Sequence, residues 1–190
     1  MGRRPIIGVI GGGGGHVSDD SPIFALAYDV GRRIALAGAV MLCGGGAGVM
    51  RAAARGANDA GGHSVGLLPR SAESEVEYTV VTDMGDGRNY LNAYISDALI
   101  ALYGEAGTLS EIGFALKIGT PIVYFGYWKF LNDNGLPRVP YVETAEEAVA
   151  AALTLLGIAP HERLGAPVKC PTIPDQTERL ARLVERVATW

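Results

Sequence analysis

The sequence contains few of the residues and segments that mark several large classes of protein. Its 190 residues include two cysteines, Cys43 and Cys170, which excludes a framework of disulfide bridges. Cys43 ends an apolar segment, and we expect it to be a small buried residue rather than a reactive thiol. The apolar segment near the N-terminus is too short for a signal peptide, and no apolar run reaches the roughly 18 residues of a membrane span. These absences predict a cytoplasmic protein without membrane association.

Basic residues are also scarce, and the net charge is −4 with a pI of about 5.4. The arginines form isolated pairs rather than a basic face, so no nucleic-acid partner is expected. The histidines and cysteines lack the spacing of zinc ligands, and none of the lysines stands in a motif that would bind pyridoxal phosphate. We therefore expect no metal site and no required cofactor.

Glycine, in contrast, is abundant, with 27 residues that follow apolar segments and show no repeat period. A hydrophobic fraction of 48% with 19% charged residues predicts a globular chain with a full core. We predict one domain over residues 1–156. A proline-rich C-terminal extension, 157–190, follows it, and we expect its last helix to pack on the domain or on an oligomer partner.

Short apolar segments alternate with helical patterns along this domain. The expected strands are 6–10, 39–42, 64–68, 78–82, 98–102, 121–125 and a short seventh at 139–142. The expected helices are 22–37, 49–60, 88–96, 108–118, 144–156 and 175–190. This alternation predicts an α/β fold of three layers, with a mainly parallel sheet of six to seven strands and helices on both faces.

The loops after the first, second and fifth expected strands are all rich in glycine. In parallel sheets, ligands bind beyond the carboxyl ends of the strands, where the strand order switches. The fifth strand leads into Gly104 to Gly107 and then a helix start, whose free N–H groups favour an anion. The sequence therefore predicts a binding site for a phosphorylated ligand where these loops meet. Three unrelated glycine turns are the alternative.

Two common phosphate-binding motifs are absent. The G-x-G-x-x-G fingerprint needs a third glycine where the chain has His16 or Val49, and no acidic residue ends the second strand. No G-x-x-x-x-G-K-[ST] segment occurs, which excludes a P-loop NTPase.

Four segments instead resemble the Lonely Guy (LOG)-like superfamily of Rossmann-type proteins, and most closely its branch near the molybdenum cofactor (Moco) carrier protein. These segments cover about residues 6–155: Ile7 to Gly12, Gly44 to Met50 (similar to GGGxxGLM), Arg88-Asn89 nine residues before Asp97-Ala98, and Gly107 to Glu111 (similar to the end of PGGxGTxxE). In LOG enzymes the arginine and the glutamate cleave the N-glycosidic bond of a nucleoside 5′-monophosphate. The resemblance implies that Arg88 and Glu111 are the catalytic pair.

The resemblance and the glycine loops together suggest a set of residues that bind the ligand and its phosphate. These are Gly12, Gly13, Gly44, Gly45, Gly46, Gly48, Met50, Asn89, Gly104, Gly107 and Thr108. The bound ligand is then a nucleotide or, in the carrier-like branch, Moco or a related phosphorylated pterin without turnover. We expect a homodimer or homotetramer.

The chain departs from the family pattern at Tyr103-Gly104-Glu105, where the family has PGG. A carboxylate in a phosphate loop repels an anion unless it points away or is paired. The direction of the Glu105 side chain therefore separates the enzyme from the carrier. A third hypothesis, DNA binding, rests on related Rossmann domains in DNA-processing proteins, and the acidic pI opposes it.

Several candidate residues also have a purely structural explanation. Thr108 and Glu111 have the spacing of a helix capping box, as do Thr144 and Glu147. Arg88 is alternatively an ordinary helix arginine, and His16 is either a ligand contact or a polar loop residue. For the last two candidates we favour the structural explanation. Asp97 orients the loop of Arg88 or caps a helix end, and the aromatic loop of Tyr127, Trp128 and Phe130 belongs to the core or a dimer surface rather than stacking on a flat ligand.

Overall fold

The computed structural model describes residues 3–126, 128 and 139–159. The six strands are β1 (Ile6–Ile10), β2 (Val40–Cys43), β3 (His63–Leu68), β4 (Tyr78–Val81), β5 (Ala98–Ala101) and β6 (Ile122–Tyr124). The helices are α1 (Pro22–Leu36), α2 (Val49–Asp59), α3 (Arg88–Ile95), α4 (Ala106–Ile118), α5 (Ala145–Leu155) and a 3₁₀ turn, η1 (Gly85–Gly87). No helix among these residues is long and apolar enough to span a membrane.

The strands form one parallel sheet in the order β4-β3-β2-β1-β5-β6. The predicted fold class is confirmed, with six strands in the sheet. Residues 139–142, expected as a seventh strand, contribute an isolated bridge between Tyr141 and Tyr124 and no extended ladder. The strand order switches at β1, which pairs with β2 on one side and with β5 on the other.

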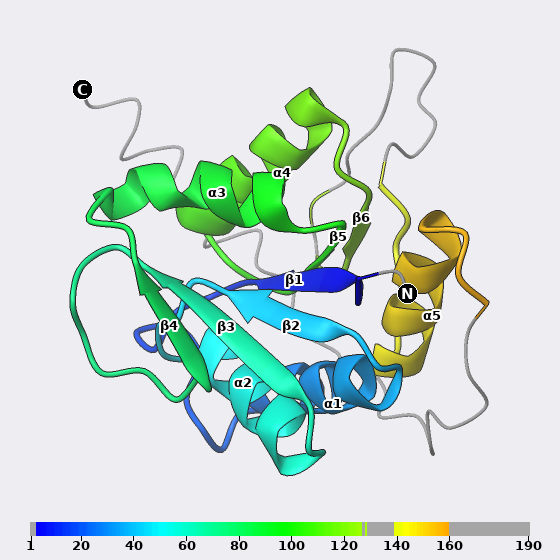
Figure 1. Ribbon diagram of the computed structural model, residues 1–190, viewed down its shortest axis with the longest axis horizontal. Coiled ribbons are helices and arrows are strands. Elements are labelled where there is room, and N and C mark those ends of the chain that lie inside the picture. Colours follow the sequence, from blue (N-terminus) through cyan, green and yellow to red (C-terminus); the bar gives the residue numbers. More distant parts are fainter. Residues whose placement is uncertain (1–2, 127, 129–138, 160–190) are drawn as a thin grey trace.

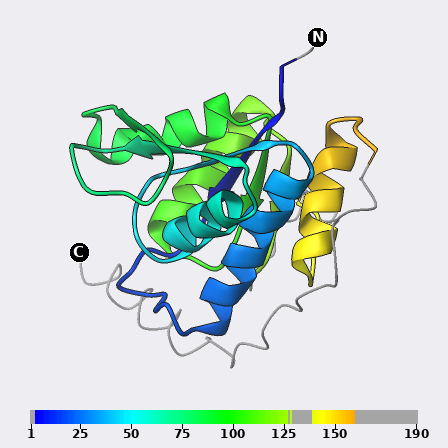
Figure 2. The same ribbon diagram turned by 60° about the horizontal axis from the view of Figure 1, so that its bottom comes forward.

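The helices cover both faces of the sheet, as Figure 1 shows. Helices α1, α2 and α5 lie on one face, and α3 and α4 lie on the other. Strand β5 is fully buried and contributes side chains to the core on both faces of the sheet. Ile100 packs under α1, α2 and α5, whereas Leu99 packs under α3 and α4. The view in Figure 2 shows α1 and α5 side by side on the first of these faces.

Helices α1 and α2 approach each other closely at two glycines. A Cβ atom at Gly31 would overlap the carbonyl oxygen of Ala53, and one at Gly56 would overlap the carbonyl oxygen of Tyr28. Both positions are buried. The absence of side chains here brings the two backbones into direct contact.

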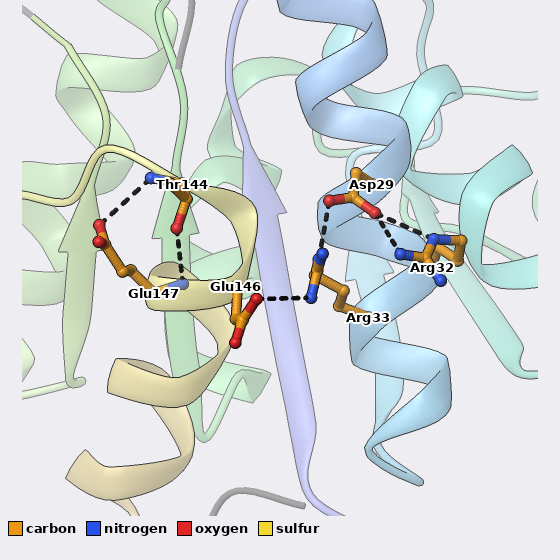
Figure 3. A network of polar contacts seen from close by, with 6 residues as sticks. All are labelled: Asp29, Arg32, Arg33, Thr144, Glu146 and Glu147. Carbon is orange, nitrogen blue, oxygen red and sulfur yellow. Dashed lines mark hydrogen bonds and ion pairs between the residues drawn. The ribbon is translucent and has the colours of Figure 1, made fainter. Parts of the chain in front are cut away.

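A buried ion-pair network joins α1 to α5 (Figure 3). The side chain of Arg33 is fully buried, and its Nε donates to Asp29 Oδ2 at 2.7 Å. Its Nη1 lies 3.5 Å from Glu146 Oε2, in the first turn of α5. Burial of an arginine is tolerated because carboxylates from both helices surround it.

The capping box predicted at the start of α5 is confirmed. Thr144 Oγ1 accepts from the amide of Glu147, and Glu147 Oε2 accepts from the amide of Thr144. Helix α5 ends at Leu155, close to the predicted end of the domain.

Some predictions fall on residues that are not described. Residues 160–190 of the proposed extension, including the expected helix 175–190, lie outside the described residues, as do Tyr127 and Phe130. Trp128 is described, and its ring stacks on Tyr124 with centroids 6.0 Å apart and packs against the core under α3 and α4. Its position supports the core alternative for this one aromatic residue.

Candidate functional site

A cleft of about 310 Å³ opens beyond the carboxyl ends of the central strands. It is lined by the end of β1 and its loop, the loop and helix start after β2, the η1–α3 segment, and the β5–α4 loop with the first turns of α4. The lining residues are Val9, Ile10, Gly11, Gly12, Gly13, His16, Gly44, Met50, Asp86, Arg88, Asn89, Glu105, Ala106, Gly107, Thr108 and Glu111. The three glycine loops that the sequence analysis singled out therefore meet at one place, as predicted.

Backbone hydrogen bonds fasten these loops to one another. The Gly12 amide donates to the carbonyl of Tyr103 at 2.8 Å, and the Val49 amide donates to the carbonyl of Gly12 at 3.0 Å. The loop after β1 is thus tied to the loops after β5 and β2. Because the glycines have no side chains, a phosphorylated ligand can approach the backbone of these loops closely.

Helix α4 begins earlier than the sequence predicted. Glu105 is the N-cap residue, and the first intrahelical bond runs from the Leu109 amide to the Glu105 carbonyl at 2.9 Å. Thr108 lies inside the first turn, where it is buried against Gly104. The capping box proposed for Thr108 and Glu111 is therefore wrong, because Thr108 does not occupy the N-cap position. A capping role no longer explains Glu111.

Glu111 is an almost completely buried carboxyl group that lines the cleft. The residue is only 6% exposed, and its Oε1 atom accepts a hydrogen bond from Asn92 Nδ2 at 2.6 Å. Burial raises the pKa of Glu111 to about 7, although the hydrogen bond from Asn92 and the nearby charge of Arg88 both oppose the rise. A carboxyl group with this pKa exchanges its proton near neutral pH, which suits acid–base chemistry.

Arg88 reaches the cleft from the first position of α3 and lies directly over Gly44. A Cβ atom at Gly44 would overlap the guanidinium group, so the glycine provides the space in which Arg88 lies. The Nε atom is buried without a hydrogen-bond partner among the described residues. Arg88 also lies near the Cys43 thiol, whose pKa burial raises to about 11, which agrees with the prediction of an unreactive cysteine.

Glu105, the departure from the family pattern, lies against His16 at the cleft. Its Oε1 is 3.3 Å from His16 Nδ1, and both side chains are partly exposed. The carboxylate is thus near a group that carries positive charge when protonated. The repulsion that Glu105 would exert on an anion is reduced whenever His16 is charged.

The structure brings most of the predicted site residues into this cleft. Four of them lie elsewhere: Gly45 and Gly46 line a neighbouring cavity of about 490 Å³, while Gly48 and Gly104 lie behind the lining. At Gly48, φ is +68° and a Cβ atom would overlap the backbone of the loop after β1. Gly48 and Gly104 therefore shape the loops, and we expect no direct ligand contact from them.

Two residues of the site were not predicted from the sequence. Asp86 of η1 lines the cleft, and Asn92 holds Glu111 from behind it. The one available signal was that Asn92 follows Arg88 by four residues, which places both on the same side of α3. Asp97, in contrast, bonds Arg3 at 2.5 Å and the Ile6 amide at 2.8 Å, a structural role at the start of β1 rather than at the loop of Arg88 or a helix end.

Metal binding finds no support in the described part of the chain. Residues 3–126, 128 and 139–159 contain no group of three or more histidine, cysteine or acidic side chains that could hold an ion. The polar groups that the described residues bring to the cleft are the buried carboxyl group of Glu111, the guanidinium group of Arg88, backbone amides, the His16–Glu105 pair, and the side chains of Asp86, Asn89 and Thr108.

Two comparisons of sequence identify related proteins. The family model described as the SLOG cluster4 family matches residues 4–151. An uncharacterized protein of Archaeoglobus fulgidus is 40% identical over 75% of this chain and 91% of its own. The cytokinin riboside 5′-monophosphate phosphoribohydrolase of Mycobacterium tuberculosis is 32% identical over 63% of this chain and 74% of its own.

Solved structures provide a second set of similar proteins. The molybdenum cofactor binding protein of Rippkaea orientalis has 32% identity and a TM-score of 0.70, covering 82% of this chain and 99% of that one. The molybdenum cofactor carrier protein of Chlamydomonas reinhardtii has 34% identity and a TM-score of 0.70, covering 81% and 99%. These likenesses agree with the resemblance inferred from the sequence motifs.

Proposed function

The chain belongs to the SLOG cluster4 family, and on that basis we propose that its cleft binds a phosphorylated nucleotide-type ligand and hydrolyses the N-glycosidic bond of nucleoside 5′-monophosphates. The observation that carries the proposal is Glu111, a buried carboxyl group held at the cleft by Asn92 with a pKa raised to about 7. Burial of an ionisable group lowers the stability of the fold, and such groups are typical of functional sites rather than of a hydrophobic core. The similarity to the phosphoribohydrolase of M. tuberculosis supports this reaction class.

The proposed reaction adds water to C1′ of the ribose while the bond from C1′ to the base nitrogen breaks. The base leaves with a proton, and ribose 5-phosphate is the second product. Ionised Glu111 stabilises the positive charge that develops at C1′ and orients the water. Arg88 binds a phosphate or ribose oxygen through its guanidinium group, and the amides at the start of α4 bind the remaining phosphate oxygens.

A base-release assay tests this proposal. The protein is incubated with 5′-monophosphates of adenosine, guanosine, inosine, cytidine and uridine, and free base is measured by chromatography. We expect release from at least one nucleotide, loss of release in Glu111→Gln, and retention in Glu143→Gln, a matched control at an exposed carboxylate that lines neither cavity. Absence of free base with every nucleotide would overturn the hydrolase proposal.

A second candidate function is the carriage of Moco or a related phosphorylated pterin without turnover. It is supported by the two Moco-binding proteins, which match this chain over 99% of their length, and by Glu105 at the helix start where a phosphate would bind. The cleft suits the phosphate end of such a cargo, because Arg88 lines it and carries a guanidinium group that binds phosphate oxygens well. Titration with the pterin, followed by fluorescence, tests this function. Micromolar binding that Arg88→Ala weakens, with ligand recovered unchanged, supports a carrier.

We also retain the proposal of a homodimer or homotetramer. It is supported by apolar side chains left uncovered in one continuous part of the chain: Tyr78, Val80, Val81, Met84, Tyr90 and Tyr94. Sedimentation analysis of the full chain measures the mass directly. A single species of 19.9 kDa, the mass of one chain, would contradict this proposal.

A further inference from the structure

Asn92 is a fully buried polar residue that takes no part in lining the cleft. It lies on α3, four residues after Arg88, and both side chains approach Glu111 from this helix. Its side chain joins α3 to α4 through one short hydrogen bond, from Nδ2 to Glu111 Oε1 at 2.6 Å. The Oδ1 atom of the same amide is buried without a partner among the described residues.

An unsatisfied buried oxygen has a cost in stability, so its retention calls for a physical reason. A carboxylate accepts hydrogen bonds only, and the N–H of an amide satisfies it. A protonated carboxyl group has an O–H to donate, and the C=O of an amide satisfies that. A side-chain amide carries both groups at nearly the same distance from its Cβ atom. Rotation by half a turn exchanges them without any movement of the backbone.

We infer that Asn92 is a positioning residue for Glu111, and that it holds the same carboxyl oxygen in both protonation states by turning its amide. When Glu111 is ionised, Nδ2 donates to Oε1, as the structure has it. When Glu111 takes up a proton on Oε1, Oδ1 of the turned amide accepts from that O–H. In both states Oε2 is left for the cleft. The inference rests on the proposed function only in so far as Glu111 is the group that reacts.

The surroundings of Glu111 agree with a specific role for this bond. The other charged or titratable groups around it are Arg88 of α3, Cys43 at the end of β2, and His16, Asp86 and Glu105, which line the same cleft. Among the described residues, Asn92 is the one group that hydrogen-bonds the carboxyl directly. The orientation of the carboxyl group therefore depends on this amide, whereas Arg88 acts on it through charge.

The first test uses the unaltered protein and needs no substrate. The side-chain NH₂ signal of Asn92 and the carboxyl carbon of Glu111 are followed by NMR from pH 5 to pH 9. We expect both to titrate with one midpoint, and we expect Glu111→Gln to abolish the titration of the amide. An Asn92 signal that stays constant while Glu111 titrates would overturn the inference, whether or not the protein proves to be an enzyme.

The second test compares variants at position 92. The bond from the amide to ionised Glu111 is charge-assisted and therefore stronger than its bond to the protonated form, so Asn92→Leu, which removes both, should raise the pKa of Glu111 by about one unit. Asn92→Asp adds a second carboxyl group and should raise this pKa further. Ser96→Ala is the matched control, because Ser96 Oγ bonds the backbone carbonyl of Asn92 and leaves the amide untouched. Equal pKa values in Asn92→Leu and the wild type would contradict the proposed role.

Where base release is observed, the same variants give a kinetic readout. We expect Asn92→Leu to lower kcat by roughly 10²-fold, to leave KM within about twofold, and to move the acidic limb of the pH profile upward with the pKa. A change confined to KM would count against positioning of Glu111. Absence of turnover in the wild type would remove the proposed function, while the NMR results would still decide the role of Asn92.

Discussion

The guanidinium group of Arg88 lies over the Cα atom of Gly44, so the position of the cationic group in the cleft depends on the missing side chain at the end of β2. We predict that Gly44→Ala displaces Arg88 and lowers ligand affinity by at least tenfold, while the fold survives because a flexible side chain is what must move. Gly15→Ala is the control, since a Cβ atom there meets nothing within 4 Å. Calorimetric titration with AMP and with the pterin measures both. Equal affinity in the two variants would disprove the dependence.

The raised pKa of Glu111 makes stability depend on pH. Burial raises the pKa from the ordinary 4.5 to about 7, so the folded state binds this proton more tightly than the unfolded chain does. The resulting stabilisation is complete below pH 4.5 and is lost as the pH rises through 7. Glu111→Gln should therefore match the wild type near pH 4 and exceed it at pH 8, by on the order of 3 kcal/mol.

Urea unfolding of both proteins at pH 4, 6 and 8 measures this difference. Glu73→Gln, which changes an exposed carboxylate, should show no such dependence on pH. A constant difference between wild type and Glu111→Gln across this range would mean that the carboxyl group is not desolvated in the folded state.

The His16–Glu105 pair should control the affinity for phosphate. Replacement of Glu105 by glutamine removes a negative charge from the cleft, and we expect phosphomonoesters to bind about three- to tenfold more tightly at low salt, with a smaller gain at high salt. His16→Gln should weaken binding, because it removes the positive charge that a protonated His16 places beside the Glu105 carboxylate. Titration with inorganic phosphate at two salt concentrations measures both effects. Weaker binding by Glu105→Gln would show that Glu105 itself contacts the ligand.

The buried charge network of Figure 3 predicts unequal effects of two similar substitutions. Asp29→Asn removes the carboxylate that Arg33 Nε contacts at 2.7 Å, inside the core, and should cost on the order of 3 kcal/mol. Glu146→Gln changes a group whose side chain is 42% exposed and should cost less than about 1 kcal/mol. Guanidinium unfolding separates them. Similar losses of stability from both substitutions would contradict the prediction that burial of the carboxylate decides the cost.

Two glycines in helices should respond in opposite directions to alanine. Gly56→Ala places a methyl group against the carbonyl oxygen of Tyr28. We expect the free energy of unfolding to fall by about 1–3 kcal/mol as α1 and α2 are pushed apart. Gly113, exposed on α4 with open space around it, should gain about 0.5–1 kcal/mol from the same change, because alanine favours the helix. Thermal unfolding with a shift of the same sign in both variants would contradict this.

Much of the architecture was predictable because it depends on local patterns. Apolar segments, helical periodicity and glycine at the ends of strands located nearly every element within a few residues, and parallel topology then brought the glycine loops together. The start of α4 was misplaced because Thr108 has the same spacing to Glu111 that Thr144 has to Glu147, where the capping box is real. Spacing alone does not distinguish a cap from a residue one turn inside a helix.

Sequence patterns could not predict which side chains meet between helices. Asn92 and Glu111 lie 19 residues apart, on α3 and α4, and no periodicity links them. Asp86 stands in a Gly-Asp-Gly turn of ordinary composition. The Glu105 side chain likewise lies against His16, which belongs to the loop after β1 and is distant from Glu105 in the sequence.

The place of β1 in the sheet has a consequence for how the chain folds. Among the described strands, β1 comes first along the chain and lies in the centre of the sheet: Ile7 pairs with Met41 on one side and with Ala98 on the other. Its second edge therefore stays open until more than half of the domain has been made. The half from β1 to β4 can assemble from neighbouring segments, whereas closure onto β5 is a long-range step that we expect to limit the folding rate. The loops of the cleft come from both sides of this seam, so the site exists only after its slowest contact has formed.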